Sequence, residues 1–201
     1  MDRPKTRGPY AKTTARRAEI LRAACEIFVE RGYERSTLRD IADRCGMSTV
    51  GMLHHFGSKE ELLAGVLLER NDQERERGQR LAQAGGDDAQ TTGQVLAVAL
   101  REHQKTPELT RLWRELSASA SRADHPAHEH FVRRYEETRA LIEDGLRDGA
   151  DERTLPGQLD PRSFATLLLA VLDGLETQWL LDPTLDIIGP LERFLHLLGD
   201  R

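Results

Sequence analysis

The sequence predicts an all-α protein with about nine helices. Strand signals are nearly absent, because β-branched and aromatic residues are sparse and no apolar/polar alternation is bounded by Asn-Gly or Asp-Gly turns. Apolar residues instead recur at helical spacing. At 201 residues the chain is long enough to bury a substantial core, in one large domain or two small ones.

The N-terminal part is predicted to hold a helix-turn-helix, which is two short helices joined by a tight turn. The helix before it has an apolar face with a period near 3.6 residues, formed by Ile20, Leu21, Ala24, Ile27 and Phe28. Gly32 is expected to end that helix. The two short helices are expected at residues 37–45 and 48–56, with Gly46-Met47 between them.

Two capping-box patterns mark helix starts, Thr37 with Asp40 and Ser58 with Glu61. From Ser58 a long helix is expected to join two domains. The first domain, residues 1–57, is the helix-turn-helix with a basic N-terminal arm. The second, residues 58–201, is a larger helical domain.

The second domain is predicted to contain about six helices. After the long helix come a glycine-rich loop at 84–88, a helix at 92–104, a helix from Pro107 broken at 122–126, a helix through Phe131 stopping near Gly149, a helix from Pro161 to Asp182, and a last helix from Pro190. Between residues 164 and 172 the sequence is apolar nearly all round. That helix is therefore expected to be covered on two sides.

Charge is divided unevenly along the chain. Residues 1–60 carry 12 Lys and Arg against 8 Asp and Glu, or +4, whereas residues 61–201 carry 17 against 26, or −9. A basic head on an acidic body suits a protein whose one end meets phosphate while the remainder stays soluble.

A continuous run of residues, 36–63, carries the most specific motifs of the chain. It contains a T-x-R-D-I-A opening, a glycine turn, an S-x-x-x-x-x-H-H-F helix and an S-K-E-x-L-L continuation. This run resembles the DNA-binding domain of the TetR (tetracycline repressor) family. The close match covers roughly residues 13–67, and beyond it only helix count, length and order agree. The resemblance implies a dimeric transcriptional regulator. We expect it to be a repressor that a small-molecule ligand releases from DNA.

The physics of this run agrees with the resemblance. Leu38 and Ile41 on the first short helix are expected to pack against Met52 and Phe56 on the second, which leaves the other face of the second helix free for a major groove. Contacts to phosphates or bases are expected from Thr37, Ser48, Thr49, Val50, Gly51, His54, His55 and Lys59.

Two positions depart from the family pattern, and a third feature compensates for them. Leu53 lies where the family usually has a phosphate-contacting tyrosine, and Gly51 where a hydroxyl or amide residue is common. Additional phosphate or minor-groove contacts are expected from the basic N-terminal segment, comprising Arg3, Lys5, Arg7, Lys12, Arg16 and Arg17.

One cluster supports an alternative function. His125, His128 and His130 could bind a metal in a small helical enzyme, because imidazoles bind zinc and metal-bound water attacks substrates. His128 and His130 are two residues apart and so face different sides of a helix. We therefore expect a solvated helix start here, no enzyme activity, no metal and no cofactor.

The larger domain is expected to bind an effector and to dimerise. Pockets between bundled helices are common ligand sites, and the candidates to line one are His103, Trp113, Tyr135 and Thr138. The expected effector is an uncharged or weakly charged, partly aromatic small molecule. A two-fold four-helix interface is expected from the last two long helices, through Phe164, Leu168, Val171, Leu175, Leu191, Phe194, Leu195 and Leu198.

The remaining expectations concern partners and location. A two-fold dimer is expected to bind double-stranded DNA at an inverted repeat. No run of about 18 apolar residues and no secretory signal is found, so a cytoplasmic protein without a membrane partner is expected. Cys25 and Cys45 show no metal-binding spacing and are interpreted as buried thiols in a reducing compartment.

Overall fold

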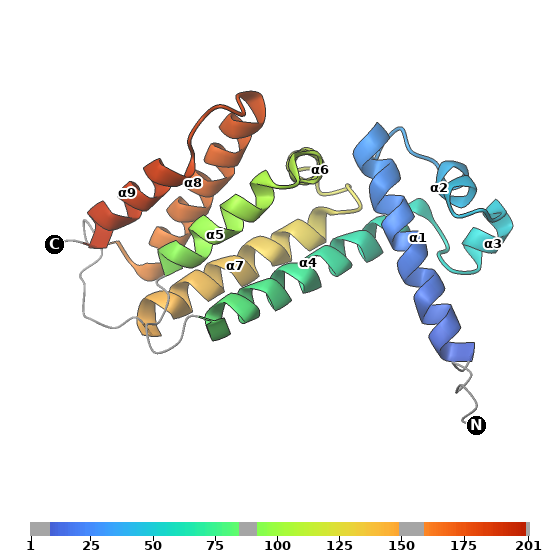
Figure 1. Ribbon diagram of the computed structural model, residues 1–201, viewed down its shortest axis with the longest axis horizontal. Helices are drawn as coiled ribbons and strands as arrows, with labels where there is room; N and C mark the ends of the chain where they lie inside the picture. The colour runs from blue at the N-terminus through green and yellow to red at the C-terminus, as the bar shows by residue number, and fades with distance from the viewer. Residues whose placement is uncertain (1–8, 85–91, 149–158, 200–201) are drawn as a thin grey trace, which may run out of the picture.

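The computed structural model describes residues 9–84, 92–148 and 159–199, and over these ranges it contains helices and no strand, as predicted. The helices are α1 (Pro9–Arg31), α2 (Leu38–Arg44), α3 (Thr49–Leu53), α4 (Lys59–Ala84), α5 (Thr92–Gln104), α6 (Pro107–Ser119), α7 (His128–Asp148), α8 (Pro161–Leu181) and α9 (Ile188–Gly199). The molecule is elongated, with α1, α2 and α3 forming a head at one end (Figure 1).

Local signals in the sequence explain where the head helices start and stop. Gly32 follows α1 with φ of +76°, and Gly46 follows α2 with φ of +61°, a backbone region that favours glycine. Thr37 and Ser48 are the N-caps of α2 and α3. The second short helix is shorter than predicted, because the amides of both His55 and Phe56 turn back to the Met52 carbonyl.

Of the two predicted capping boxes, one is complete and one is altered. The Thr37 hydroxyl accepts from the Asp40 amide while the Asp40 carboxylate accepts from the Thr37 amide. At α4 the Ser58 hydroxyl accepts from the Glu61 amide at 3.2 Å, but the Glu61 carboxylate accepts from the Gly57 amide at 2.7 Å. The box at Ser58 is therefore shifted by one residue on its carboxylate side.

The first apolar cluster fills the head and extends beyond it. Its fully buried members include Ile20, Phe28, Ile41 and Phe56 in the head. Leu62 and Leu63 in the first turns of α4 belong to the same cluster. It also takes in α6 and the turn before α7, through Leu112, Trp113, Leu116, Ala120, Ala127 and Phe131. The head is thus packed against the α6–α7 region and is not joined to the body by α4 alone.

The second apolar cluster lies farther along the molecule, between α5, α7, α8 and α9. Its members include Leu100, Ile142, Leu168, Trp179 and Leu191. Two side-chain hydrogen bonds join α4 to α7. Arg75 donates to Glu137 and Arg134 donates to Asn71, both at 2.8 Å. Figure 1 shows these two long helices running beside each other toward the head.

Helix α8 is both long and strongly apolar. By length and composition alone it could cross a membrane, but it contains the buried Glu176 and packs against α7 as part of the second cluster. Within one chain it is covered mainly on one side, because Leu167 stays 53% exposed and Leu181 83% exposed. The second cover expected from the sequence is not supplied by the residues that the structure describes.

The two cysteines differ from their expectation. Both are free thiols and both are half-buried, where full burial was expected. Burial nevertheless raises the pKa of each thiol, which keeps it protonated at neutral pH.

Candidate nucleic-acid interface

Helix α3 turns one face inward and leaves the other open. Met52 is completely buried and Phe56 is 1% exposed, whereas Val50 is 67% and Leu53 44% exposed. His54 is exposed, and Thr49, Gly51 and His55 are half-buried. The structure therefore presents the residues expected to read DNA on the outer side of this short helix.

The turn before α3 fixes the start of the helix. The Ser48 hydroxyl accepts from the Gly51 amide at 3.1 Å, and the Met47 amide donates to the Ala42 carbonyl at 3.0 Å. A Cβ added at Gly51 would meet only the Ser48 hydroxyl and the end of the Met47 side chain, at 3.4 and 3.5 Å. Glycine is therefore not required sterically at this position.

Arg16 of α1 supports the turn between α2 and α3. Its guanidinium donates to the Cys45 carbonyl at 2.9 Å and to the Met47 sulfur at 3.7 Å, and it pairs with Glu19 at 2.7 Å. Sequence analysis assigned this arginine to a DNA-contacting arm. The structure places Arg16 within α1 with its donors used inside the head, and its contact with DNA stays a prediction.

Arg17 supports the other end of α3 in the same way. It donates to the His55 carbonyl and lies 4.0 Å from the centre of the Phe56 ring. The guanidinium also approaches Glu61 at 3.8 Å. Arg17 is likewise a support within the head. Of the other expected arm residues, Arg3, Lys5 and Arg7 lie outside the described residues, as does the side chain of Lys12.

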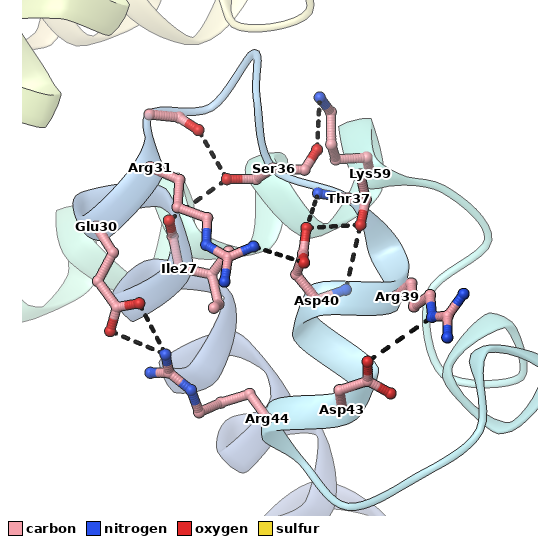
Figure 2. Close-up of polar contacts among 11 residues, drawn as sticks. Ile27, Glu30, Arg31, Ser36, Thr37, Arg39, Asp40, Asp43, Arg44 and Lys59 are labelled. Atoms are coloured by element: carbon pink, nitrogen blue, oxygen red, sulfur yellow. Dashed lines mark hydrogen bonds and ion pairs between the residues drawn. The ribbon is translucent and has the colours of Figure 1, made fainter.

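The N-terminus of α2 is held by a polar network around Asp40 (Figure 2). The Thr37 hydroxyl donates to Asp40 at 2.6 Å, and Arg31 of α1 pairs with Asp40 at 2.6 Å. The hydrogen bond from Thr37 and then the charge of Arg31 hold the pKa of Asp40 below its ordinary value. Because the Thr37 hydroxyl has one proton and gives it to Asp40, donation to a phosphate would require this bond to open.

A second clamp joins the end of α2 to α1. Arg44 contacts Glu26 at 3.1 Å and Glu30 at 2.8 Å. Figure 2 shows the contact with Glu30. Its hydrogen bond to Glu30 lowers the pKa of that carboxyl. Arg39 pairs loosely with Asp43 at 3.8 Å on the outer side of α2. Ion pairs to α1 thus fix both ends of α2, which sequence reasoning did not anticipate.

Lys59, the first residue of α4, binds the loop between α1 and α2. Its ammonium donates to the carbonyls of Tyr33 at 3.0 Å, Ser36 at 3.2 Å and Glu34 at 3.4 Å, and it lies 4.2 Å from the centre of the Tyr33 ring. Figure 2 shows the contact with Ser36. An ammonium has three protons, so this geometry uses all of them within the head.

The three histidines on which the alternative enzyme function depended do not point toward a common site. The His125 ring is buried and accepts from the Ala127 amide at 3.2 Å, the His128 ring bonds to the Ala120 carbonyl at 2.8 Å, and His130 lies edge-on to Phe131. Among the described residues, no three His, Cys, Asp or Glu side chains come together as a metal ion would require.

Comparison with known proteins decides the family. The N-terminal model described as "Bacterial regulatory proteins, tetR family" matches residues 20–66. The model described as "BetI-type transcriptional repressor, C-terminal" matches residues 89–197, more than half of the chain. The chain belongs to the TetR family. It is a DNA-binding transcriptional regulator, and the matched regions include both the helix-turn-helix and the helical body.

Individual relatives agree with this family. The chain is 28% identical to the HTH-type transcriptional regulator TtgR of Pseudomonas putida over 187 residues, 89% of this chain and 87% of TtgR. It is 43% identical over 56 residues to the transcriptional repressor KstR2 of Mycobacterium tuberculosis, 28% of each chain. In fold it is similar to the fatty acid degradation regulator FadR of Bacillus halodurans, with a TM-score of 0.75, 18% identity and 98% coverage of both chains.

In this TetR-family chain, two of the four expected pocket residues meet a polar network that the sequence did not reveal. His103 of α5 pairs with Glu176 of α8, and Tyr135 of α7 donates to Asp173 of α8 at 2.5 Å. Arg114 of α6 pairs with Asp173 and approaches Glu176 at 3.4 Å. Burial and the bond to Asp173 raise the pKa of Tyr135. Four helices therefore meet at one partly buried cluster of charges, in which the side chain of Glu176 is 7% and that of Asp173 33% exposed.

The other two expected pocket residues lie apart from this network. Trp113 belongs to the first apolar cluster, under the Arg70 guanidinium at 5.5 Å. The Thr138 hydroxyl donates to the Arg134 carbonyl of its own helix at 2.8 Å. The three charged members, Arg114, Asp173 and Glu176, were missed because a charge on a helix gives no sequence signal that it faces inward.

The expected dimer residues of the TetR-family body divide into buried and surface positions. Phe164, Leu168 and Leu191 are 7%, 2% and 0% exposed and belong to the core of their own chain, so the expectation that they meet a partner is corrected. Val171, Leu175 and Leu195 are half-buried, and Phe194 is 36% exposed. The side chain of Leu198 lies outside the described residues. Leu167 of α8 was not among the expected dimer residues, but its side chain is 53% exposed.

Proposed function

We propose that this regulator is a homodimeric repressor that binds an inverted-repeat operator and is released by a small molecule bound in its helical body. The observation that carries the proposal is the construction of α3. Its outer side chains are exposed, while α1 holds both ends of the helix through main-chain carbonyls. Such a helix can enter a major groove without losing its support.

The exposed apolar face of the body supports self-association. Leu167 and Leu181 of α8 and Phe194 of α9 are all exposed, next to the half-buried Val171 and Leu175. A second copy would supply the cover that α8 lacks, in a two-fold four-helix arrangement. Two α3 helices related by a two-fold axis then fit half-sites about one DNA turn apart.

The partly buried network of α5, α6, α7 and α8 supports effector control of the body. Arg114 already neutralises much of the charge of Asp173 and Glu176. An uncharged or weakly charged, partly aromatic effector fits this setting, because it can exchange the hydrogen bond of the neutral Tyr135 hydroxyl without breaking an ion pair. We infer that the protein acts in the cytoplasm, where its DNA lies.

The decisive experiment is selection of bound duplexes from random or genomic DNA, followed by a quantitative gel shift. An inverted repeat is expected to emerge and to be bound more tightly than its scrambled version. Equal affinity for both would rule out α3 as a sequence reader. Thr49 and His54 variants are expected to change which half-site is preferred, whereas Lys59→Ala is expected to weaken all sequences alike.

A matched pair of surface variants tests the dimer. Leu167→Asp places a charge on the exposed face of α8, and Leu141→Asp places the same charge on α7, where the leucine is 70% exposed. Sedimentation is expected to show dissociation and weaker operator binding for Leu167→Asp only. A wild-type protein that sediments as a folded monomer at micromolar concentration would contradict the proposal.

A further inference from the structure

One histidine of the body is buried against the DNA-binding head. His125 lies in the turn between α6 and α7, and its side chain is 1% exposed. The ring Nδ1 accepts from the Ala127 amide at 3.2 Å, so the neutral ring carries its proton on Nε2. The His125 amide and carbonyl also bond within the turn, to Arg122 and His128 at 3.1 and 2.9 Å. The position of the ring is therefore set by the conformation of this turn.

The other side of the His125 ring faces the loop between α1 and α2. It meets the Tyr33 ring edge-on with a centroid separation of 6.1 Å, and Nε2 lies 3.9 Å from Glu34. Tyr33 is 6% exposed and also packs edge-on against Phe28 at 5.4 Å. Tyr33 is thus held between the core of the head and a turn that belongs to the body.

Tyr33 also contacts Lys59 through the face of its ring. The ammonium lies 4.2 Å from the ring centre and donates to the carbonyls of Tyr33 and Ser36. A cation over an aromatic ring is stabilised by the ring's negative face. The loop held in this way ends at Thr37, the N-cap of α2. His125, Tyr33 and Lys59 therefore form a continuous column from the α6–α7 turn to the start of the helix-turn-helix.

We propose that His125 and Tyr33 are positioning residues for DNA binding, which act by holding Lys59 and the loop before α2 in the DNA-binding position. The proposal rests on the DNA-binding function and adds a contact through which the body sets the head. The first apolar cluster favours it, because Ala120 and Ala127, on either side of His125, are buried in the same cluster as Phe28 and Tyr33. A movement of the turn must therefore move the loop or open this packing.

The test measures the affinity of the free protein for the duplex recovered by selection. His125→Ala, a change outside the DNA-binding head, is expected to weaken binding about five- to ten-fold, the lower part of the range for coupled sites. The double variant His125→Ala/Lys59→Ala is expected to lose less than the product of the two single losses, because both changes break one column. Tyr33→Leu is expected to show the same loss and Tyr33→Phe, which keeps the ring, to restore most of the binding.

The matched control is His128→Ala at the start of α7, where the ring bonds to the Ala120 carbonyl. It is expected to bind within about two-fold of wild type, the scatter of independent sites. In the DNA-free protein, hydrogen exchange at residues 33–40 is expected to speed up for His125→Ala and not for His128→Ala.

The outcomes separate this inference from the proposed function. If the wild-type protein selects no sequence, the proposed operator function fails, yet the exchange experiment still tests the column. If wild type binds its duplex but His125→Ala binds and exchanges like wild type, or if the losses of His125→Ala and Lys59→Ala simply multiply, the positioning role is overturned. Unfolding midpoints of all variants show whether a loss reflects unfolding instead.

Discussion

The head and the body of this protein place their charged side chains in opposite ways. In the head the core contains no buried charged side chain among the described residues, and cations such as Arg16, Arg17 and Lys59 lie around it, bound to main-chain carbonyls. In the body Arg114 and Glu176 lie between the helices themselves. The head thus keeps its charged side chains outside its apolar packing, whereas the body places charges within the packing of its helices.

This difference predicts that the two regions respond differently to substitution. Truncation in the head should cost energy through lost packing, while truncation in the body should cost energy through charges left without partners. The following changes test that contrast in order of expected size.

The largest loss is expected for Phe28→Ala in the core of the head. Phe28 is completely buried and contacts Tyr33. Removing a buried phenyl ring leaves a cavity and is expected to lower the free energy of unfolding by about 4 kcal/mol. Urea unfolding measures this, with the exposed Leu141→Ala as a control. A loss below that of the body variants would contradict the contrast.

A smaller but clear loss is expected for Arg114→Met in the body. It leaves Asp173 and the buried Glu176 without their cation. Breaking a buried pair is strongly destabilising, and because Asp173 is partly exposed we expect about 2 kcal/mol. The control is Arg75→Met, which breaks the exposed pair with Glu137 and is expected to cost less than about 0.5 kcal/mol. Equal losses would show that the network is solvated.

A loss of about 1 kcal/mol is expected for Thr37→Ala, which removes the N-cap of α2. Thr37→Ser keeps the hydroxyl and should retain the stability. Urea unfolding of the two variants isolates the cap. A loss equally large in Thr37→Ser would mean that the methyl group, and not the hydrogen bond, provides the stabilisation.

The smallest effect is a change in pH dependence for Asp40→Asn. The pKa of Asp40 is lowered in the folded state by Thr37 and Arg31, so the unfolded state takes up a proton at higher pH. This stabilisation is present above the ordinary carboxyl pKa and is lost as pH falls through the folded value. Wild type should therefore lose stability in acid more steeply than the variant. Parallel unfolding midpoints below pH 5 would show that Asp40 is not the group responsible.

The sequence predicted the helices better than it predicted the roles of their charged residues. The cap at Thr37 and the glycine at 32 depend on neighbours a few residues away, so local patterns were sufficient. The contacts that Arg16 and Arg17 make inside the head were not predicted, because their acceptors at Cys45 and His55 lie 29 and 38 residues further along the chain.

The candidate sites divide in the same way. The exposed face of α3 was found because helical period and a family motif agreed on it. Sequence alone did not show which apolar residues of α8 are free to meet a partner. An apolar pattern indicates that a helix is covered, but it does not indicate which neighbour covers each side chain. Phe164 and Leu168 are covered by their own chain, whereas Leu167 is exposed.

The main-chain support of the recognition helix has a consequence for how such a regulator changes its target over time. Arg16 and Arg17 bind the carbonyls of Cys45 and His55, and every amino acid has a carbonyl. The exposed positions between them, Val50, Leu53 and His54, can therefore be exchanged while the scaffold beneath them stays intact. We therefore expect libraries restricted to the outer face of α3 to yield folded proteins with new DNA preferences.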